Sequence, residues 1–424
     1  MVNTFKFTPS DIAYLREVLP HAEDGFFQWL ASLDCSSVKV YAVKGSLGVG
    51  QLLETPLLNL LNFASLVTTN ATRFKKAAGP DKKLLEFGLR RAQGPDGGLS
   101  ASRYSYMAGF AGTSNVLAGK LHKIPIMGTH AHAFVQAHTT LDDVKVTTLD
   151  GKNFLDVVLK YRNELGHTQT NDSGVPNFVC VALALHELGH RPVGIRLDSG
   201  DLSYLSKRCR EAFIAAGECY NIDYFKSLNI TASNDINEPV LNSLNEQRHE
   251  INAYGIGTHL VTCQAQPALG MVYKLVEING EPRIKLSQDV SKVTIPGRKE
   301  AFRLIGANGK PLLDLMTGCN EKAPEVGKKM LCRNPFDELR RAFVTPSQVI
   351  PLHSLYWDGP NGGLVGELPT LEERRQYVIE QFELIREDVV RSLNPTPYKV
   401  SVSNELYEFI HDLWMKEYPV QELD

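Results

Sequence analysis

Three short apolar runs, each ending in small polar residues, constrain the fold of this chain more than any other feature. They are PVGIRLDSGDL (192–202), SLNITASNDIN (227–237) and AYGIGTHLVTC (253–263). A β-forming stretch that stops at Gly, Ser, Asp or Asn is typical of a buried parallel strand whose carboxyl end opens onto a site. The pattern predicts an α/β fold with an irregular (β/α) barrel core and a site at the carboxyl ends of its strands.

The two ends of the chain differ from this middle part. Before it, the pattern predicts a helix over 8–34, a strand over 38–43 and a long helix from Gln51 that closes at Gly79. After it, a polar β-rich stretch begins near Val276 and a charged amphipathic helix is predicted over 371–394. We therefore expect an amino-terminal flanking segment (1–80), a barrel core with the active site (81–275) and a carboxyl-terminal flanking region (276–424), so that both ends build the flanking domain.

Composition excludes several classes of protein. The 424 residues carry a net charge of -3 with both signs interspersed, which offers no basic field for nucleic acid. We find neither a signal-peptide apolar region nor a membrane-spanning run, and we expect a cytoplasmic protein with no membrane partner. The seven cysteines have no CxxC spacing, so they are expected to be reduced thiols rather than a disulfide framework or a zinc ribbon.

The last of the three strand ends suggests phosphate binding. Gly255 and Gly257 bring bare backbone N–H groups close together, and Thr258 adds a hydroxyl where a helix is expected to start. A glycine-rich turn alone is a weak signal. Its position at the end of a series of strand-then-helix units strengthens it, because barrels of this kind commonly bind phosphate there.

Seven segments in order resemble the nicotinate phosphoribosyltransferases of the type II phosphoribosyltransferase fold: LLEFGLRRAQGPDGG, FAGTSNVLAG, MGTHAHAF, RLDSGDL, SNDIN, GIGTHLVTC and VYKLVEINGEPRIKLSQD. The resemblance runs from about Leu52 to Gly306. It implies a homodimer that joins nicotinate to 5-phosphoribosyl 1-pyrophosphate, giving nicotinate mononucleotide and pyrophosphate in NAD biosynthesis. It further implies Mg²⁺, and ATP as a co-substrate hydrolysed through a phosphohistidine.

The resemblance also implies the site residues. His132, and not His130, matches the phosphohistidine. Asp198 and Asp201 are the metal-ligand candidates, reaching Mg²⁺ through water. The substrate-binding candidates are Arg90, Arg91, Ser114, Thr129, Arg196, Asp198, Ser199, Gly200, Asn234, Gly255, Gly257 and Thr258.

Their chemistry suits the reaction. Pyrophosphate leaves an anomeric carbon through an electron-poor state, which calls for cations and N–H donors at the leaving phosphates. The guanidinium groups of Arg90 and Arg91 can grip a carboxylate or phosphate with two hydrogen bonds, although one of the two is expected to face solvent. Ser114 stands where the nicotinamide-using relatives carry a carboxylate, which favours the acid as substrate.

Two of these residues also have purely structural interpretations. Arg196 is an arginine at a strand end and could simply pair with Asp198. Thr129 could be the N-cap of the following helix, a role that is compatible with binding.

A competing motif is His186-Glu187-Leu188-Gly189-His190, which matches the HExxH zinc-peptidase pattern on a predicted helix. The third-histidine position of the longer form holds Arg196, Val193 stands in place of its glycine, and Pro192 is expected to end the helix. A zinc metallopeptidase is therefore the third and most distant hypothesis.

Three pieces of the family pattern are missing from this chain. They are the amino-terminal segment with its ring-stacking aromatic residue, a β-rich stretch after Lys44, and a longer stretch with a barrel strand between about Tyr161 and Val175. Phe5 and Phe7 are not expected to replace the aromatic residue, because the short segment before them does not permit the approach to the ring. A shortened isoform or an incomplete gene model explains all three. The alternative function is accordingly a catalytically impaired form that acts as a partner subunit.

Overall fold

The computed structural model describes residues 49–165, 174–285, 293–358 and 363–417. They divide into two compact units, and each is described by itself. An α/β unit holds Leu61–Gly270 and Leu371–Ile379, and a β-rich unit holds Met271–Thr370, Glu380–Asp424 and the chain before Leu61. The elements predicted over 8–34 and 38–43, together with Phe5 and Phe7, lie outside the described residues.

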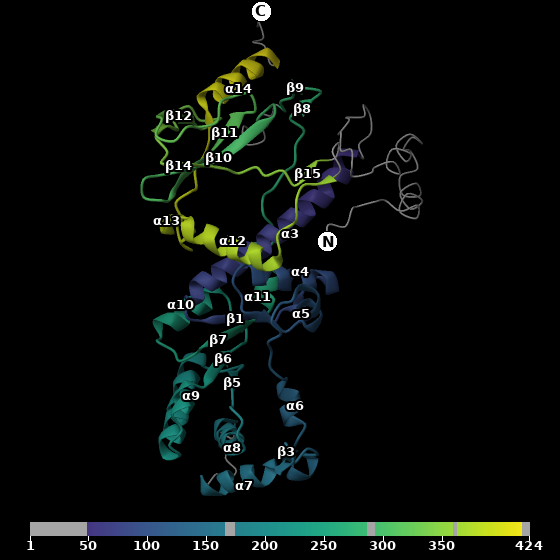
Figure 1. The fold of residues 1–424 in the computed structure, drawn as a ribbon, viewed down its shortest axis with the longest axis vertical. Helices are drawn as coiled ribbons and strands as arrows, with labels where there is room; N and C mark the ends of the chain where they lie inside the picture. Colours follow the sequence, from purple (N-terminus) through teal and green to yellow (C-terminus); the bar gives the residue numbers. More distant parts are fainter. Residues whose placement is uncertain (1–48, 166–173, 286–292, 359–362, 418–424) are drawn as a thin grey trace, which may run out of the picture. The chain divides into compact units, whose positions relative to one another are not determined.

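The α/β unit follows the predicted alternation of strands and helices (Figure 1). The helix α3 (Val49–Ala78) leads into it, and Gly79 ends that helix at φ +94°, as the sequence predicts. The remaining elements are β1 (Lys83–Glu86), η1 (Leu89–Arg91), α4 (Gly94–Met107), β2 (Gly112–Thr113), α5 (Val116–His122), α6 (His132–Gln136), η2 (Leu141–Asp143), β3 (Thr148–Leu149), β4 (Lys152–Asn153), α7 (Phe154–Glu164), α8 (Gly174–Glu187), β5 (Gly194–Leu197), α9 (Leu202–Cys219), η3 (Asp223–Ser227), β6 (Asn229–Ala232), α10 (Glu238–Glu246), β7 (Ala253–Ile256) and α11 (Thr258–Val261).

One parallel sheet organises this unit. Its five strands lie in the order β2-β1-β7-β6-β5, and every neighbouring pair is parallel. A single parallel bridge from Thr113 to Ile126 extends the sheet beyond β2. Because all strands run the same way, the residues that follow β1, β2, β5, β6 and β7 gather at one edge. The three apolar runs that the sequence singled out form β5, β6 and β7.

The two outer strands of this row are β2 and β5, and in the described residues no pairing joins them. The stretch where the sequence expects a missing barrel strand falls between them along the chain. β5 is partly exposed at all four positions, Ile195 and Leu197 included, whereas every residue of β7 is buried. Val193, just before β5, is 75 % exposed. An apolar strand edge is therefore open to solvent where a neighbouring strand would cover it.

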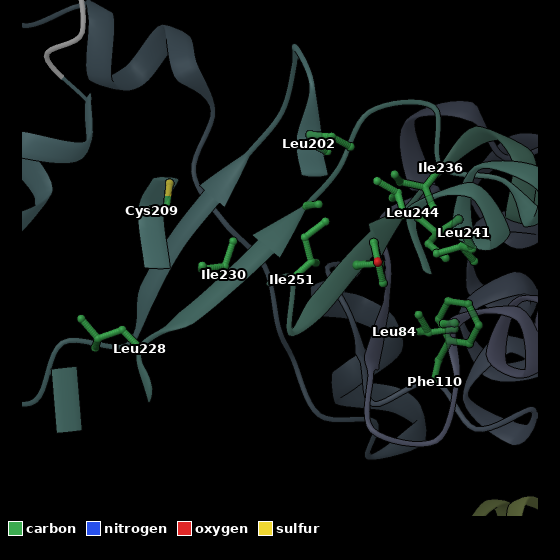
Figure 2. Close-up of a cluster of buried hydrophobic side chains, with 14 of the residues drawn as sticks. Leu84, Phe110, Leu202, Cys209, Leu228, Ile230, Ile236, Leu241, Leu244 and Ile251 are labelled. Carbon is green, nitrogen blue, oxygen red and sulfur yellow. The ribbon is translucent and has the colours of Figure 1, made fainter. Parts of the chain in front are cut away.

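The core of the α/β unit lies between the sheet and its helices. Figure 2 shows part of it, with Leu84 from β1 beside Phe110, Leu241 and Leu244 from α10 close together, and Ile230 from β6 farther along the sheet. These residues are at most 5 % exposed. At about 1.5–3 kcal/mol for each large apolar side chain, their burial supplies the main stabilisation that fixes the strand ends in place.

A second, mostly antiparallel sheet forms the β-rich unit. Its six strands lie in the order β13-β12-β17-β11-β10-β14. Alternate residues of β11 are buried, as expected for a sheet with one solvated face. The elements of this unit are β8 (Glu277–Ile278), β9 (Glu281–Pro282), β10 (Lys299–Ile305), β11 (Pro311–Gly318), β12 (Met330–Arg333), β13 (Arg341–Val344), β14 (Gln348–Pro351), β15 (Trp357–Asp358), β16 (Gly363–Leu364), α12 (Leu371–Leu384, which begins in the α/β unit), α13 (Glu387–Val390), β17 (Val400–Ser403) and α14 (Asn404–Glu417).

Two predicted helices differ in the structure. The single helix expected over 371–394 is divided into α12 and α13. The break occurs because Arg386 is extended, at φ -66° and ψ 144°, and its guanidinium pairs with both carboxylate oxygens of Asp388. The α8 helix ends at Glu187, before the Pro192 that was expected to stop it. Gly189 adopts φ +89° and the His190 N–H donates to the Leu185 carbonyl, so the helix ends three residues before His190, the last residue of the motif.

Candidate active site at the carboxyl ends of the strands

A pocket of about 650 Å³ opens at the edge of the parallel sheet where the strands end. Its walls come from the segments that follow β1, β2, β5, β6 and β7 and from the start of α6. The structure brings together eleven of the predicted site residues: Arg90, Arg91, Ser114, Thr129, His132, Arg196, Asp198, Asn234, Gly255, Gly257 and Thr258. Phe87, Ala131, Ser233, Asp235, Ile236 and His259 complete the lining.

Two arginines form one wall of the pocket. Arg90 and Arg91 lie on η1, a single turn that starts at Gly88 directly after β1. Both are exposed and both line the pocket, so the expectation that one of them faces away is not met. Within the described chain, neither guanidinium makes an ion pair with a carboxylate. Two uncompensated cations therefore face the cavity, which suits it to an anionic ligand.

A third arginine, Arg196, contacts the same carboxylate as His132. Arg196 is the third residue of β5, its side chain is 17 % exposed, and its Nη2 lies 3.6 Å from Oδ2 of Asp198. The same Asp198 oxygen lies 3.7 Å from Nδ1 of His132. Oδ1 of Asp198 accepts a hydrogen bond from the Ser233 hydroxyl. The structural interpretation of Arg196 as a partner of Asp198 is thus correct, and it holds inside the pocket.

The end of β6 contributes a strained segment. Asn234 and Asp235 follow the strand with φ angles of +93° and +49°, a conformation that residues other than glycine rarely adopt. Both residues are exposed and line the pocket. Backbone strain of this kind costs of order 1–3 kcal/mol per residue and is concentrated at functional sites.

The glycine-rich turn after β7 has the predicted form. Gly255 and Ile256 end the strand, Gly257 is the residue before α11, and Thr258 is the first residue of that helix. A Cβ atom on Gly255 would collide with the ring of Phe87, which lies beside it and also lines the pocket. The absence of a side chain at Gly255 therefore leaves room for the Phe87 ring to line the pocket. Gly257 is tightly placed as well, since a Cβ there would lie 3.1 Å from the Phe87 carbonyl oxygen.

Three predicted residues are not part of the lining. Ser199 and Gly200 lie on the turn after β5, and Gly200 adopts φ +77° there. Asp201 is the N-cap of α9, and its Oδ1 accepts the Tyr204 N–H at 2.9 Å. The cap interpretation of Thr129 is wrong, because the residue before α6 is Ala131 and it makes no side-chain cap.

Several lining residues were missed in the sequence although a signal for them was present. Phe87 follows β1 directly, so the rule that strand ends carry the site applies to it as it does to Asp198. Ser233 and Asp235 flank Asn234 in the same motif. His259 follows Thr258. Ser233, Asp235 and His259 each lie next to a position that was singled out, and Phe87 lies three residues before Arg90.

The three polar side chains of the HELGH segment each make hydrogen bonds or ion pairs with different residues. His186 Nδ1 lies 3.1 Å from the Tyr224 hydroxyl, and His190 Nε2 lies 2.9 Å from Asp150. Glu187 accepts hydrogen bonds from Lys160 at 2.9 Å and from the Tyr161 hydroxyl at 2.6 Å, and these bonds hold its pKa below the usual range. In the part of the chain that the structure describes, no cluster of three or more His, Cys, Asp or Glu side chains could hold a metal ion.

A pocket lined by three arginines at the carboxyl ends of parallel strands is typical of α/β enzymes that act on anionic substrates. Comparison with known proteins makes the class specific. Residues 82–341 match the nicotinate phosphoribosyltransferase (NAPRTase) family, and residues 298–410 match the nicotinate phosphoribosyltransferase C-terminal domain. The chain therefore belongs to the nicotinate phosphoribosyltransferase family, and it is an enzyme.

Individual relatives agree with this assignment. The nicotinate phosphoribosyltransferase of Dictyostelium discoideum is 48% identical over 477 positions that cover 100% of this chain and 81% of the relative. That of Homo sapiens is 39% identical, covering 99% of this chain and 88% of the relative. The crystal structure of human nicotinic acid phosphoribosyltransferase matches with a TM-score of 0.79 at 35% identity, covering 97% of this chain and 89% of that chain.

The same comparison bears on the missing stretches. The match to the Dictyostelium enzyme spans 477 positions, whereas this chain has 424 residues. The relative therefore carries segments inside the matched region that have no counterpart here. The family assignment favours the phosphoribosyltransferase over both the partner-subunit and the zinc-peptidase hypotheses.

No helix among the described residues is long and apolar enough to cross a bilayer.

Proposed function

We propose that the pocket binds nicotinate and 5-phosphoribosyl 1-pyrophosphate and joins them to nicotinate mononucleotide, with release of pyrophosphate. The observation that carries this proposal is the convergence of three arginines, the Gly255–Thr258 turn and His132 on one cavity. Both substrates are anionic, and the arginines Arg90 and Arg91 have no carboxylate partner within the described chain. The cavity thus offers cations to the leaving phosphates and bare N–H groups at the turn, which is what departure of pyrophosphate requires.

The segment after β2 suits an acid substrate. Ser114 is exposed at the pocket, and its hydroxyl donates to the Glu86 carbonyl at 3.2 Å. A serine there leaves the neighbouring arginines available for the nicotinate carboxylate. A carboxylate at the same position would pair with them and repel that substrate. We therefore propose nicotinate, rather than nicotinamide, as the preferred base.

We also propose that His132 accepts a phosphoryl group from ATP. Asp198 faces Nδ1 of its imidazole, an arrangement that favours the tautomer with the proton on Nδ1 and the lone pair on Nε2. The Nε2 atom is then the nucleophile that attacks the γ-phosphorus, and ADP leaves. With its side chain 54% exposed, His132 is accessible to a nucleotide. Asp198 stabilises the imidazole as its positive charge develops, and so acts as the orienting carboxylate.

Magnesium fits this pocket through few protein ligands. Mg²⁺ is usually bound by one or two carboxylates together with substrate phosphates and water. Asp198 and Asp235 are the carboxylates that line the cavity, whereas the carboxylate of Asp201 already caps α9. Asp198 and Asp235 would hold the ion, and the bound ion would neutralise part of the charge on the substrate phosphates. We therefore propose Asp198 and Asp235 as the magnesium ligands, and we assign Asp201 the role of N-cap of α9.

Assembly and location remain proposals that follow from the resemblance. We propose a homodimer in the cytoplasm. Light scattering coupled to gel filtration gives the mass of the particle in solution, and fractionation of cells gives the compartment. A monomer at micromolar concentration would contradict the dimer.

A direct assay tests the proposed reaction. Purified protein is incubated with nicotinate, 5-phosphoribosyl 1-pyrophosphate and Mg²⁺, with and without ATP, and nicotinate mononucleotide is measured. The variants Arg196→Ala and Arg91→Ala should each raise the apparent KM for one substrate, in line with about 1.5–3 kcal/mol for a lost charged hydrogen bond. A matched control is Arg208→Ala on the exposed side of α9, where the arginine pairs with Glu211. Unchanged KM values in both pocket variants would contradict the assignment.

A further inference from the structure

A buried carboxyl group lies directly behind the pocket without lining it. Glu86 is the last residue of β1 and is 1% exposed. Its Oε2 accepts hydrogen bonds from the Ser102 hydroxyl of α4 at 2.7 Å and from the Thr113 hydroxyl of β2 at 2.5 Å. Its Oε1 accepts the Gly88 N–H. We call Glu86, Ser102 and Thr113 the buried carboxyl network.

This network has no positive partner. In the described ranges of the chain, no Lys, Arg or His makes an ion pair with Glu86. A carboxyl group buried among neutral groups is costly, because it loses its hydration and only hydrogen bonds replace it. Ser102 and Thr113 are themselves buried, at 1% and 0% exposure. A hydrophobic side chain would fill this space with less cost, so packing alone does not account for an acid here.

The contacts of Glu86 lead to two walls of the pocket. On one side its carboxyl group holds Gly88, whose carbonyl oxygen accepts the Arg91 N–H at 2.8 Å and so starts the turn that carries both arginines. On the other side its backbone carbonyl accepts the Ser114 N–H at 2.9 Å. Thr113, held by the same carboxyl group, accepts the Asn115 N–H at 2.9 Å. One residue thus ties the arginine turn (Gly88–Arg91) to the segment that presents Ser114.

Gly88 also connects the buried carboxyl network to the turn after β7. A Cβ atom at Gly88 would collide with the Val261 side chain of α11, the helix that begins at Thr258. A Cβ atom at Gly257 would lie 3.9 Å from the Gly88 Cα. Because Gly88 packs this closely, a shift of its backbone would displace Val261 and the turn after β7.

We propose that Glu86 is a positioning residue that sets the affinity of the enzyme for its substrates by fixing the arginine turn relative to Ser114. This inference rests on the proposed substrate pocket. Glu86 touches no substrate. It acts through Gly88 and Thr113, and its effect is on the spacing of groups that bind.

Steady-state kinetics distinguish this role from a contribution to stability alone. A variant that only unfolds more easily has fewer active molecules, which lowers the apparent kcat and leaves KM unchanged. Displaced binding groups raise KM in the molecules that remain folded. KM for nicotinate and for 5-phosphoribosyl 1-pyrophosphate, kcat and the midpoint of thermal unfolding are measured for each variant.

Helix α4 offers a matched pair of variants. Ser102→Ala removes a buried hydroxyl that donates to Glu86, whereas Ser105→Ala removes a buried hydroxyl one turn away that has no hydrogen-bond partner among the described residues. We expect Ser102→Ala to raise KM for at least one substrate about threefold, and Ser105→Ala to leave both KM values within about 1.5-fold of the unmodified protein. Glu86→Gln should raise KM at least about fivefold, since its amide presents a donor to hydroxyls that now donate.

The outcomes are distinguishable. If Arg196→Ala and Arg91→Ala leave KM unchanged, the pocket assignment fails. If those two raise KM while Glu86→Gln and Ser102→Ala do not, only the positioning role is overturned. If Glu86→Gln does not fold, Ser102→Ala and the pair Thr113→Val and Thr113→Ser decide the question. The proposal requires that Thr113→Val raises KM and that Thr113→Ser, which keeps the hydroxyl, leaves KM close to that of the unmodified protein.

Discussion

Nδ1 of His132 lies 3.7 Å from Oδ2 of Asp198, and the two residues come from segments more than sixty positions apart in the chain. His132 begins α6, and Asp198 follows β5. The parallel sheet brings them to one edge, where Asp198 also contacts Arg196 and Ser233. A histidine, an arginine and a hydroxyl therefore share one carboxylate at the mouth of the pocket.

His132→Ala should abolish stimulation by ATP while slow product formation without ATP persists. Loss of the phosphate acceptor removes the covalent route, but the arginines and the turn after β7 still position the substrates. The measurement is product formation with and without ATP, together with retention of label from the γ-phosphate. His130→Ala is the control, because His130 does not line the pocket and its ring packs near Phe134. Label retained by the His132→Ala protein would refute the assignment.

Ser114→Asp should lower the preference for nicotinate over nicotinamide. The new carboxylate would stand among the pocket arginines, pair with them and accept a hydrogen bond from a carboxamide, so the ratio of kcat/KM for the two bases should fall by at least about tenfold. Ser114→Asn, which adds similar bulk without charge, separates charge from size. Equal use of both bases by the unmodified protein would count against our view of the pocket.

Metal analysis of the purified protein should return no stoichiometric zinc. His186 contacts Tyr224, and His190 contacts Asp150. Glu187 accepts hydrogen bonds from Lys160 and Tyr161. Helix α8 ends before His190, so the two histidines do not lie one helical turn apart. The two histidines should therefore share no ion at the roughly 2.0–2.1 Å of a zinc–nitrogen bond. One zinc per chain, lost together with activity on chelation, would restore the peptidase hypothesis.

Insertion of the barrel strand that the family resemblance predicts between Tyr161 and Val175 should raise thermal stability and turnover. A strand beside β5 would pair its free edge and cover Ile195 and Leu197, which are partly exposed now. Differential scanning calorimetry and kcat on the two proteins side by side provide the comparison. An inserted segment of the same length rich in Gly and Ser is the control. Indistinguishable midpoints and turnover would show that the strand is dispensable.

The stability contributed by His249 should be lost as the pH falls. Burial, followed by the charge of Lys82, lowers the pKa of this histidine to about 4, whereas an unfolded histidine titrates near 6.5. Between these values the unfolded chain binds a proton that the folded chain does not, so stability rises with pH across that window and is complete above it. The imidazole accepts the Ile251 N–H at 2.9 Å and lies 2.8 Å from the Tyr254 hydroxyl.

Urea unfolding at pH 7, 6 and 5 measures this effect. His249→Gln removes the titrating group, so the difference in the free energy of unfolding between the two proteins should shrink as the pH falls. A difference that stays constant across the three pH values would contradict the assignment of the pKa shift.

The parts of the site that followed from sequence are those that obey the strand-end rule. Arg196, Asp198, Asn234 and Thr258 stand directly at the ends of predicted strands, and parallel pairing alone brings them together. The sequence could not reveal that Asp201 caps α9 or that Glu86 lies behind the pocket, because capping and long-range hydrogen bonds depend on side-chain directions and on partners such as Ser102 and Thr113. Helix ends were also missed where a local contact decides them, as the pair of Arg386 and Asp388 does between α12 and α13.

The close approach of Phe87 to Gly255 means that position 255 must lack a side chain for two separate reasons. The missing side chain of Gly255 leaves the turn free to present its backbone, and it also leaves room for an aromatic ring from the neighbouring strand end. Even a methyl group there would displace the ring into the cavity or push β7 away from β1. In a library of all single substitutions, position 255 should therefore tolerate as little as the residues that perform the chemistry, although glycine itself offers the substrate no functional group.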